Sequence, residues 1–303
     1  MTSRYRIGLI GLGEVGQVLA NDLNRNGGVD LCAWDCLFPR ADSEPRRAAA
    51  TLPFLTVASS TAEAVRTRAI VISAVTAGEC RAAALEAAPA LSPGAYFLDL
   101  NSVSPRSKVE AARAVESAGG RYVEAAVMSP IAPHRIASPV WLGGPHAEDF
   151  LPLAKSLGFA GAAVYSATIG AASAAKLCRS VIIKGMEALL GESLLTARRH
   201  GVEDAVLESL QDFFPVGDWH ELARYMISRS LRHGGRRAEE MREAARTVAE
   251  AGLEPWMSRG CAERQQWAAT HAESLSHEAL KDMLDDVLAR TPMPERIQKA
   301  GRR

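Results

Sequence analysis

The stretch IGLIGLGEVG, residues 7–16, decides the fold of this chain. An apolar, strand-like run leads into a G-x-G-x-x-G turn, and a helix-like segment follows. A second strand-like run then ends at Asp35, 19 residues after the last glycine. A glycine triplet alone is weak evidence, but a strand, a helix and a distal acid around it predict a dinucleotide-binding βαβ unit.

The three glycines have different physical roles in such a unit. Gly11 permits the tight turn, Gly13 lets the backbone approach a pyrophosphate, and Gly16 lets the helix pack close to the sheet. The N–H groups at the helix start favour phosphate, and Asp35 can accept hydrogen bonds from a ribose diol. A glycine-rich turn in a doubly wound protein without a nucleotide is the alternative. The predicted cofactor contacts are Gly11, Leu12, Gly13, Glu14, Val15, Gly16, Asp35, Val75 and Thr76.

The choice between NAD and NADP rests on the end of the second strand. The carboxylate of Asp35 would repel a 2′-phosphate, which favours NAD. Arg40 lies five residues further on and could reach such a phosphate if residues 36–39 fold back. We therefore expect NAD or NADP as the cofactor and favour NAD.

Bulk composition narrows the classes of function. The 303 residues suit two domains, and a hydrophobic content of 48% allows a sizeable core. Thirty-five basic residues balance 35 acidic ones, so we expect no nucleic-acid partner. Residues 1–5 do not resemble a signal peptide and no apolar run reaches membrane-spanning length, so we expect a cytoplasmic protein without a membrane partner. Five scattered cysteines and seven dispersed histidines predict reduced thiols and no metal site.

Residues 6–165 alternate short apolar runs with helix-length segments. This alternation predicts a Rossmann-type, doubly wound α/β domain with a mostly parallel sheet over residues 1–165. Ligands bind beyond the carboxyl ends of such strands, so the loops after Ala74, Asp99 and Ala126 should line one crevice with the glycine turn. The expected strands are Arg6–Ile10, Val29–Trp34, Leu55–Val57, Ala69–Ala74, Tyr96–Asp99, Tyr122–Ala126, Val140–Leu142 and Ala163–Tyr165, with helices such as Val15–Asn26, Cys80–Ala90 and Pro105–Ser117 between them.

Strand-like runs disappear after Tyr165, and residues 166–303 predict an all-α second domain for substrate binding or dimerisation. A long helix is expected over 170–200, and its apolar faces suggest a homodimer that buries them. Residues 292–303 are polar and basic, so we expect them to fray. The further helices expected are Glu203–Phe213, Trp219–Arg232, Arg236–Ala251, Arg259–Ala272 and Glu278–Ala289, with Gly234-Gly235 and Pro255 as breaks.

Two loops at the predicted crevice carry candidate substrate contacts. The segment DLNSVSP, residues 99–105, runs from a strand end into a helix, where short polar side chains beside helix N–H groups can seat a carboxylate. Asn101 and Ser102 are the candidates there, while simple capping of the helix by Ser104 is the alternative. In the loop after Ala126, Ser129 is a further candidate, and a solvated loop is the alternative.

The long predicted helix carries the candidate for proton transfer. Lys176, Ser180 and Lys184 recur every four residues on an otherwise apolar helix and form one polar stripe. An ammonium partly desolvated in such a stripe has a lowered pKa, which suits general acid/base catalysis by Lys176. A lysine whose ammonium reaches solvent is the alternative. Ser180 and Lys184 are candidate substrate contacts on the same stripe.

Together these motifs resemble the β-hydroxyacid dehydrogenases, whose relatives include hydroxyisobutyrate dehydrogenase and phosphogluconate dehydrogenase. GLIGLGEVG resembles the family's cofactor loop, DLNSVSP its D-x-S-T-x-x-P substrate loop, and the G-x5-K spacing of Gly170 and Lys176 its catalytic helix. The segments KLCRSVIIKGMEALLGE and HGGRRAEEM resemble a less characterised branch with a distinct C-terminal helical domain.

The resemblance implies an NAD(P)-dependent dehydrogenase acting on the CH–OH group of a small hydroxyacid or related alcohol. It assigns acid/base catalysis to Lys176 and substrate-carboxylate contacts to Asn101 and Ser102. Ser180 stands where the family has asparagine, and Ile183 stands where phosphogluconate dehydrogenase has a glutamate for decarboxylation, so we expect oxidation or reduction without decarboxylation. An imine reductase and a catalytically silent nucleotide-binding regulator are the alternatives.

Overall fold

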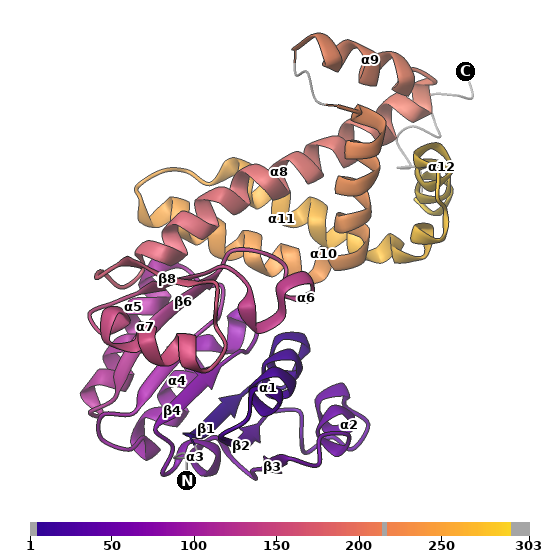
Figure 1. Cartoon of the computed structure of the whole chain (residues 1–303). Helices are drawn as coiled ribbons and strands as arrows, with labels where there is room; N and C mark the ends of the chain where they lie inside the picture. The colour runs from indigo at the N-terminus through magenta and orange to yellow at the C-terminus, as the bar shows by residue number, and fades with distance from the viewer. Residues whose placement is uncertain (1–4, 214–216, 292–303) are drawn as a thin grey trace. The chain divides into compact units, whose positions relative to one another are not determined.

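The computed structural model describes residues 5–213 and 217–291 of the chain (Figure 1). These residues form two compact units. The first consists of the described residues up to Cys178 with Arg246–Gly252, and the second consists of the described residues among 179–245 and from Leu253 onward. The sequence-based boundary near residue 165 remains a prediction, as does the frayed end at 292–303, which lies outside the described residues.

The first unit is built on one eight-stranded sheet in the order β3-β2-β1-β4-β5-β6-β7-β8. Each expected strand is present with bounds that agree to within one residue, and the predicted Rossmann-type α/β fold is confirmed. The strands are β1 Tyr5–Ile10, β2 Val29–Trp34, β3 Leu55–Val57, β4 Ile70–Ser73, β5 Tyr96–Asp99, β6 Arg121–Val127, β7 Val140–Gly143 and β8 Ala162–Ser166.

Neighbouring strands pair in parallel with one exception. Strand β7 runs antiparallel to β6, with Val127 opposite Val140. The connection of residues 128–139 suits this direction, because it contains only the short turns Ile131–His134 and Arg135–Ala137, whereas a parallel crossover usually contains a full helix. The carboxyl ends of β1, β2, β4, β5 and β6 therefore lie along one edge of the sheet.

Helices cover both faces of this sheet (Figure 1). Successive strand residues point to opposite faces, so Ile70 and Ile72 of β4 belong to one buried cluster and Val71 to another. The first cluster includes residues of α1 and α7, and the second includes residues of α3, α4 and α5. The helices of this unit are α1 Glu14–Asn26, α2 Glu44–Ala50, α3 Thr61–Val65, α4 Cys80–Ala87, α5 Pro105–Ser117, α6 Ile131–His134 and α7 Ala147–Ser156, with single-turn η1 Ala77–Glu79, η2 Ala88–Ala90 and η3 Arg135–Ala137.

The second unit is helical and has its own apolar core. Leu194, Leu207, Ile227, Met283 and Leu284 are among its buried side chains. Its elements are α8 Ala171–His200, α9 Glu203–Phe213, α10 Trp219–Glu250, α11 Trp256–Ala268, η4 Ala269–Ser276 and α12 Leu280–Arg290. The first turns of α8 and the last turns of α10 belong to the first unit.

The break expected at Gly234-Gly235 is wrong, because α10 is one continuous helix from Trp219 to Glu250. The reason is packing. A Cβ atom on Gly234 would lie 2.3 Å from the carbonyl oxygen of Gln265 and 2.8 Å from the amide nitrogen of Ala269, whereas a Cβ on Gly235 would meet nothing within 4 Å. Gly234 thus serves a close approach between helices and does not end one.

This pair of glycines gives a matched test of the packing. Replacing a helix-interior glycine by alanine removes a conformational entropy cost of about 1 kcal/mol. We expect Gly235→Ala to raise the free energy of unfolding by up to about that amount. Gly234→Ala should lower it by about 1–3 kcal/mol, because the added methyl overlaps the neighbouring backbone. Urea unfolding of the two variants measures this, and equal effects would contradict the packing argument.

Candidate active site

The glycine turn between β1 and α1 has the geometry of a phosphate cradle. Gly11 has φ +93°, and a Cβ there would lie 2.3 Å from the carbonyl oxygen of Ala74. A Cβ on Gly16 would lie 2.2 Å from the carbonyl oxygen of Gly11. A Cβ on Gly13 would meet nothing within 4 Å, so the space above this backbone is open. These residues fit a bound pyrophosphate, because α1 begins at Glu14 and its first-turn amides have no side-chain cap from Gly13.

Asp35 holds this turn against the end of β2. The residue is buried, at 8% exposed, and its Oδ2 accepts a hydrogen bond from the amide of Leu12 (2.8 Å). Oδ1 accepts a second bond from the amide of Leu37 (2.9 Å). Arg40, the residue that could reach a 2′-phosphate, is exposed. The ribose contact of Asp35 stays a prediction.

Asn101 joins the loops that follow β4 and β5. Its side-chain oxygen accepts a hydrogen bond from the amide of Val75 (2.7 Å), and its side-chain nitrogen donates one to Ser73 Oγ (3.0 Å). A predicted substrate residue and a predicted cofactor residue are therefore in direct contact. Thr76 follows directly and precedes the single turn η1.

Beneath this loop lies a buried network centred on Asp99. Its Oδ1 is 2.9 Å from the ammonium of Lys108, and its Oδ2 accepts a hydrogen bond from the hydroxyl of Tyr122 (2.6 Å). The amide of Asn101 donates to Oδ1 (2.9 Å). Burial opposes charge on Lys108, but the carboxylate of Asp99, together with Cys80 and Glu124, outweighs it and raises the pKa of the lysine. Burial and the same carboxylate raise the pKa of Tyr122 well above its usual range. The network fixes where the loop of residues 99–105 starts, and nothing in the sequence pattern pointed to Lys108.

Lys176 lies in the second turn of α8, where its ammonium donates a hydrogen bond to Ser102 Oγ (2.6 Å). Both side chains are partly exposed. Ser102 follows β5 and Lys176 comes 74 residues later, so the fold joins two predicted site residues at the carboxyl edge of the sheet.

The start of α8 is fixed by Glu124 of β6, which the sequence analysis missed. This carboxylate has no solvent exposure and accepts hydrogen bonds from the amides of Gly170 and Ser173, both at 2.6 Å. A lone acid inside the otherwise apolar run YVEAAV was the available signal, because a buried carboxylate requires partners.

A second carboxylate, that of Glu250, binds at the start of α5. Ser104 is the N-cap and Pro105 the first helical residue, as predicted. Ser104 Oγ also donates to the carboxylate of Glu250 (2.7 Å), which accepts a further bond from the amide of Arg106 (3.2 Å). The first turn of α5 is thus bound to a carboxylate of the chain itself, and Asn101 and Ser102 lie just before it.

The loop after β6 is held by an ion pair with α1. Arg135 has φ +53° and its guanidinium binds both oxygens of the buried Asp22 of α1, at 2.8 to 3.1 Å. The hydrogen bonds that Arg135 donates to Asp22 raise the pKa of the guanidinium. Ser129 donates a local hydrogen bond to the carbonyl oxygen of Pro130 (3.2 Å), and its substrate contact stays a prediction.

Ser180 and Lys184 lie in the second unit, where both are buried. The ammonium of Lys184 donates to Ser180 Oγ (3.2 Å) and binds the carboxylate of Glu240 on α10. Cys261 of α11 donates to the backbone oxygen of Lys184 (3.1 Å), and burial raises the pKa of this thiol to about 11. These contacts tie three helices together, and a substrate role for either residue stays a prediction.

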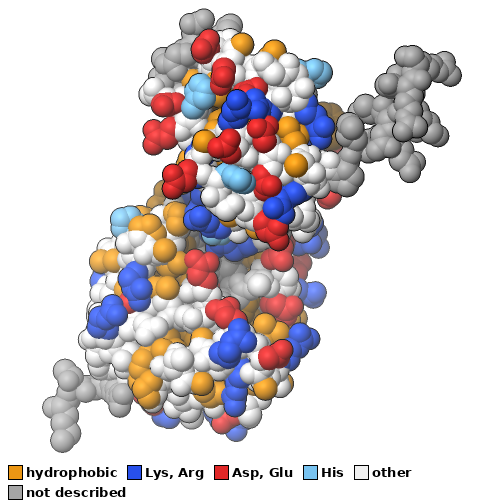
Figure 2. Space-filling view, turned by 90° about the vertical axis from the view of Figure 1, so that its right-hand side faces the viewer, with side chains coloured by type: hydrophobic (Ala, Val, Ile, Leu, Met, Phe, Trp, Pro, Cys, Tyr) orange, Lys and Arg blue, Asp and Glu red, His pale blue; other side chains and the backbone are white. Residues whose placement is uncertain are grey.

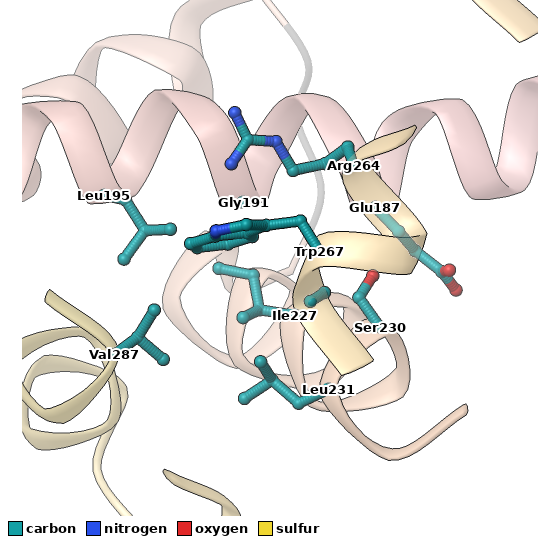
Figure 3. Close-up of a pocket in the computed structure, with 10 residues that line it drawn as sticks. Glu187, Gly191, Leu195, Ile227, Ser230, Leu231, Arg264, Trp267 and Val287 are labelled. Atoms are coloured by element: carbon teal, nitrogen blue, oxygen red, sulfur yellow. The ribbon is translucent and has the colours of Figure 1, made fainter. Parts of the chain in front are cut away.

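A small cavity lies among α8, α10, α11 and α12 in the second unit (Figure 3). Its volume of about 20 Å³ holds one water but no hydroxyacid. The Arg264 guanidinium lies over the Trp267 ring, 4.8 Å from its centroid. Ser230 Oγ is buried beside the cavity without a protein partner, which suits one ordered water.

The described residues contain no helix long and apolar enough to cross a membrane. Among the same residues, no group of three or more histidine, cysteine, aspartate or glutamate side chains could hold a metal ion. Acidic, basic and apolar side chains are interspersed over the face shown in Figure 2.

The comparisons with known proteins assign the chain to a family. The model of the NAD binding domain of 6-phosphogluconate dehydrogenase matches residues 6–170, more than half of the chain. The chain belongs to this family. A domain of unknown function, DUF1932, matches residues 197–268. The resemblance inferred from the motifs is confirmed, and the first unit is a nicotinamide-dinucleotide-binding domain.

Three relatives illustrate the range of this family. A conserved hypothetical protein from Sinorhizobium meliloti 1021 is 34% identical, with a TM-score of 0.74 over 96% of this chain and 98% of its own. A second solved structure, a conserved protein of unknown function described as similar to 3-hydroxyacid dehydrogenases, is 31% identical, with a TM-score of 0.66 over 88% of this chain and 98% of its own.

The third relative is the mitochondrial 3-hydroxyisobutyrate dehydrogenase of Mus musculus. It is 25% identical over 215 residues, which are 69% of this chain. The match spans 62% of the length of that relative.

The buried pair of Asp99 and Lys108 gives a test of what holds the loop of residues 99–105. Lys108→Met leaves a buried carboxylate without its cation, so we expect the free energy of unfolding to fall by about 3–5 kcal/mol. The double variant Asp99→Asn/Lys108→Met removes both charges and should lose less than the single variant. Urea unfolding measures both, and a double variant less stable than Lys108→Met would contradict the pairing.

Proposed function

We propose that this chain is an NAD(P)-dependent oxidoreductase that transfers hydride between the nicotinamide cofactor and a small hydroxyacid or related alcohol. The observation that carries the proposal is the 2.6 Å hydrogen bond between Lys176 Nζ and Ser102 Oγ at the carboxyl edge of the sheet. It joins a proton-transfer group to the substrate loop in the same compact unit as the glycine turn.

In this proposal Lys176 is the general acid/base. During oxidation its neutral amine takes the hydroxyl proton of the substrate while the adjacent carbon loses a hydride. A bound nicotinamide supplies the hydride acceptor in that direction and the donor in the other. During reduction the Lys176 ammonium returns the proton to the carbonyl oxygen. Ser102 can exchange its bond to Lys176 for one to the substrate oxygen, which places that oxygen at the amine.

The other site residues bear on the choice of substrate and cofactor. Both polar ends of the Asn101 side chain are already bonded within the protein, so Ser102 is the stronger candidate for a direct substrate contact. Ile183 has no proton to donate, which supports redox chemistry without decarboxylation. Asp35 at the tip of β2 supports NAD as the preferred cofactor.

Lys176→Ala tests the mechanism. We expect turnover to fall by about 10²–10⁴-fold with cofactor affinity nearly unchanged, because the lost step is proton transfer and not binding. Lys176→Arg is the matched variant that separates proton transfer from charge. It keeps the positive charge but does not deprotonate, so its turnover should be similarly slow.

The assay follows reduced cofactor by absorbance, with NAD and NADP offered separately. Its substrates are 3-hydroxyisobutyrate, related 3-hydroxyacids and, in the reductive direction, cyclic imines. Unchanged turnover in Lys176→Ala would reject the mechanism, preferred turnover of imines would favour an imine reductase, and cofactor binding without any turnover would favour a silent regulator.

We also propose that the chain forms a homodimer through α8. Ile182 and Leu189 are 65% and 57% exposed, lie two turns apart on one side of the helix, and have Gly185 between them. A Cβ on Gly185 would meet nothing within 4 Å, so a second backbone can approach there. Such an apolar stripe around a glycine is complementary to itself, which suits a two-fold interface between copies of the chain.

The double variant Ile182→Asp/Leu189→Asp tests the interface. Light scattering at micromolar concentration should give the mass of a dimer for the wild type and of a monomer for the variant, because two carboxylates would be desolvated in each copy. Leu253→Asp, at an equally exposed apolar position in the same unit, is the control and should leave the mass unchanged. A monomeric wild type would overturn the dimer.

A further inference from the structure

The carboxylate of Glu124 accepts two short hydrogen bonds from backbone amides at the start of α8. The charge lies at the centre of β6 without solvent exposure, and its Oε2 and Oε1 accept hydrogen bonds from the amides of Gly170 and Ser173. The first four amides of a helix have no partner within the helix, and their partial positive charge favours an anion. One side chain from another element thus caps α8 with both of its oxygens.

We propose that Glu124 is the positioning residue of the active site, which sets the place of Lys176 through the first turn of α8. This inference rests on the proposed acid/base role of the lysine. Lys176 follows Gly170 by six residues, which is about 9 Å of helix rise. A rigid helix transmits the position of its capped first turn to the ammonium, and the ammonium must stay within hydrogen-bond reach of Ser102 to act there.

The surroundings leave the capping carboxylate little freedom. A Cβ on Gly143 of β7 would lie 2.6 Å from Glu124 Oε2, so glycine at that position makes room for the carboxylate. Gly170, with φ +93°, lies against the start of α5, where its Cβ would be 3.0 Å from Pro105 Cβ. The start of α8 therefore adjoins the start of the helix that follows Ser102. A change in the cap would shift the lysine relative to its partner.

The first experiment measures the position of Lys176 without any turnover. A water-soluble acylating reagent labels lysine amines, and mass spectrometry compares Lys176 with Lys155, an exposed lysine of the same unit that normalises for reagent. The fully buried Lys108 reports on global unfolding, because it is labelled only when the unit unfolds. In Glu124→Gln one amide keeps an acceptor while the other faces an NH₂ group, so we expect several-fold more labelling of Lys176 relative to Lys155. An unchanged ratio in Glu124→Gln and Glu124→Ala would overturn the proposal.

The second experiment separates positioning from stability. We expect kcat to fall about 10-fold in Glu124→Gln and about 100-fold in Glu124→Ala, with the KM for the cofactor unchanged, because displacements near 1 Å cost about that much. Ser60→Ala is the control. It removes the cap that accepts from the Glu63 amide at α3, outside the site, and should lower Tm but not kcat.

The outcomes distinguish this inference from the proposed function. A wild-type kcat in both Glu124 variants, or a fall matched by the cofactor KM, would overturn the positioning role. A wild-type protein without turnover on the whole substrate panel would reject the dehydrogenase, and the labelling ratio would then decide alone whether Glu124 positions Lys176.

Discussion

One physical requirement recurs along the sheet: a carboxylate buried within a strand or just after one needs hydrogen-bond donors. Burying an unpaired carboxylate costs several kcal/mol, so each fold that keeps one must supply partners. Asp35 of the β2 end receives the amide of Leu12, Asp99 of β5 receives the amide of Asn101, and Glu124 of β6 receives two amides of α8. Each bond fixes the position of a neighbouring segment: the glycine turn before α1, the loop after β5 and the start of α8.

These carboxylates differ in how their charge is balanced, and the difference matches what each one holds. Asp99 faces a fully buried ammonium and a buried phenol, which makes a rigid point for the loop above it. Glu124 interacts electrostatically with the same ammonium, but its hydrogen bonds come from the amides of a helix start, whose dipole also favours its charge. Hydrogen bonds from amides to a carboxylate are shorter and stronger than those between neutral groups. Here the two bonds to Glu124 also set the direction of the start of α8.

The elements of the sheet could be predicted from sequence because their signals are local. Strands such as Ile70–Ser73 are apolar on both faces, which is expected only of a sheet covered on both sides. The glycine turn was equally visible, since Gly11 and Gly16 each occupy a place where a side chain would overlap backbone. The same local reasoning was wrong at Gly234, because the close helix contact that requires this glycine lies about 30 residues away in the sequence and overrides its low helix propensity.

The polar contacts of the site could be predicted only in part, because their partners also lie far away in the sequence. The motifs named Ser102 and Lys176, yet Glu124, which binds the start of α8, and Lys108, which binds Asp99, have partners far along the chain or on another element. A single acid or lysine in an apolar run has many possible partners until the register of the sheet is known. With the register known, Glu124 lies opposite Gly143 on the neighbouring strand, and the missing side chain there leaves the carboxylate room to reach α8. Lys176 belongs to the unit that contains the sheet, whereas Ile182 and Leu189, further along the same helix, belong to the other. Under the two proposals, the chemistry and the assembly of this chain can be altered separately, because the cap on α8 would govern the first and the exposed stripe the second.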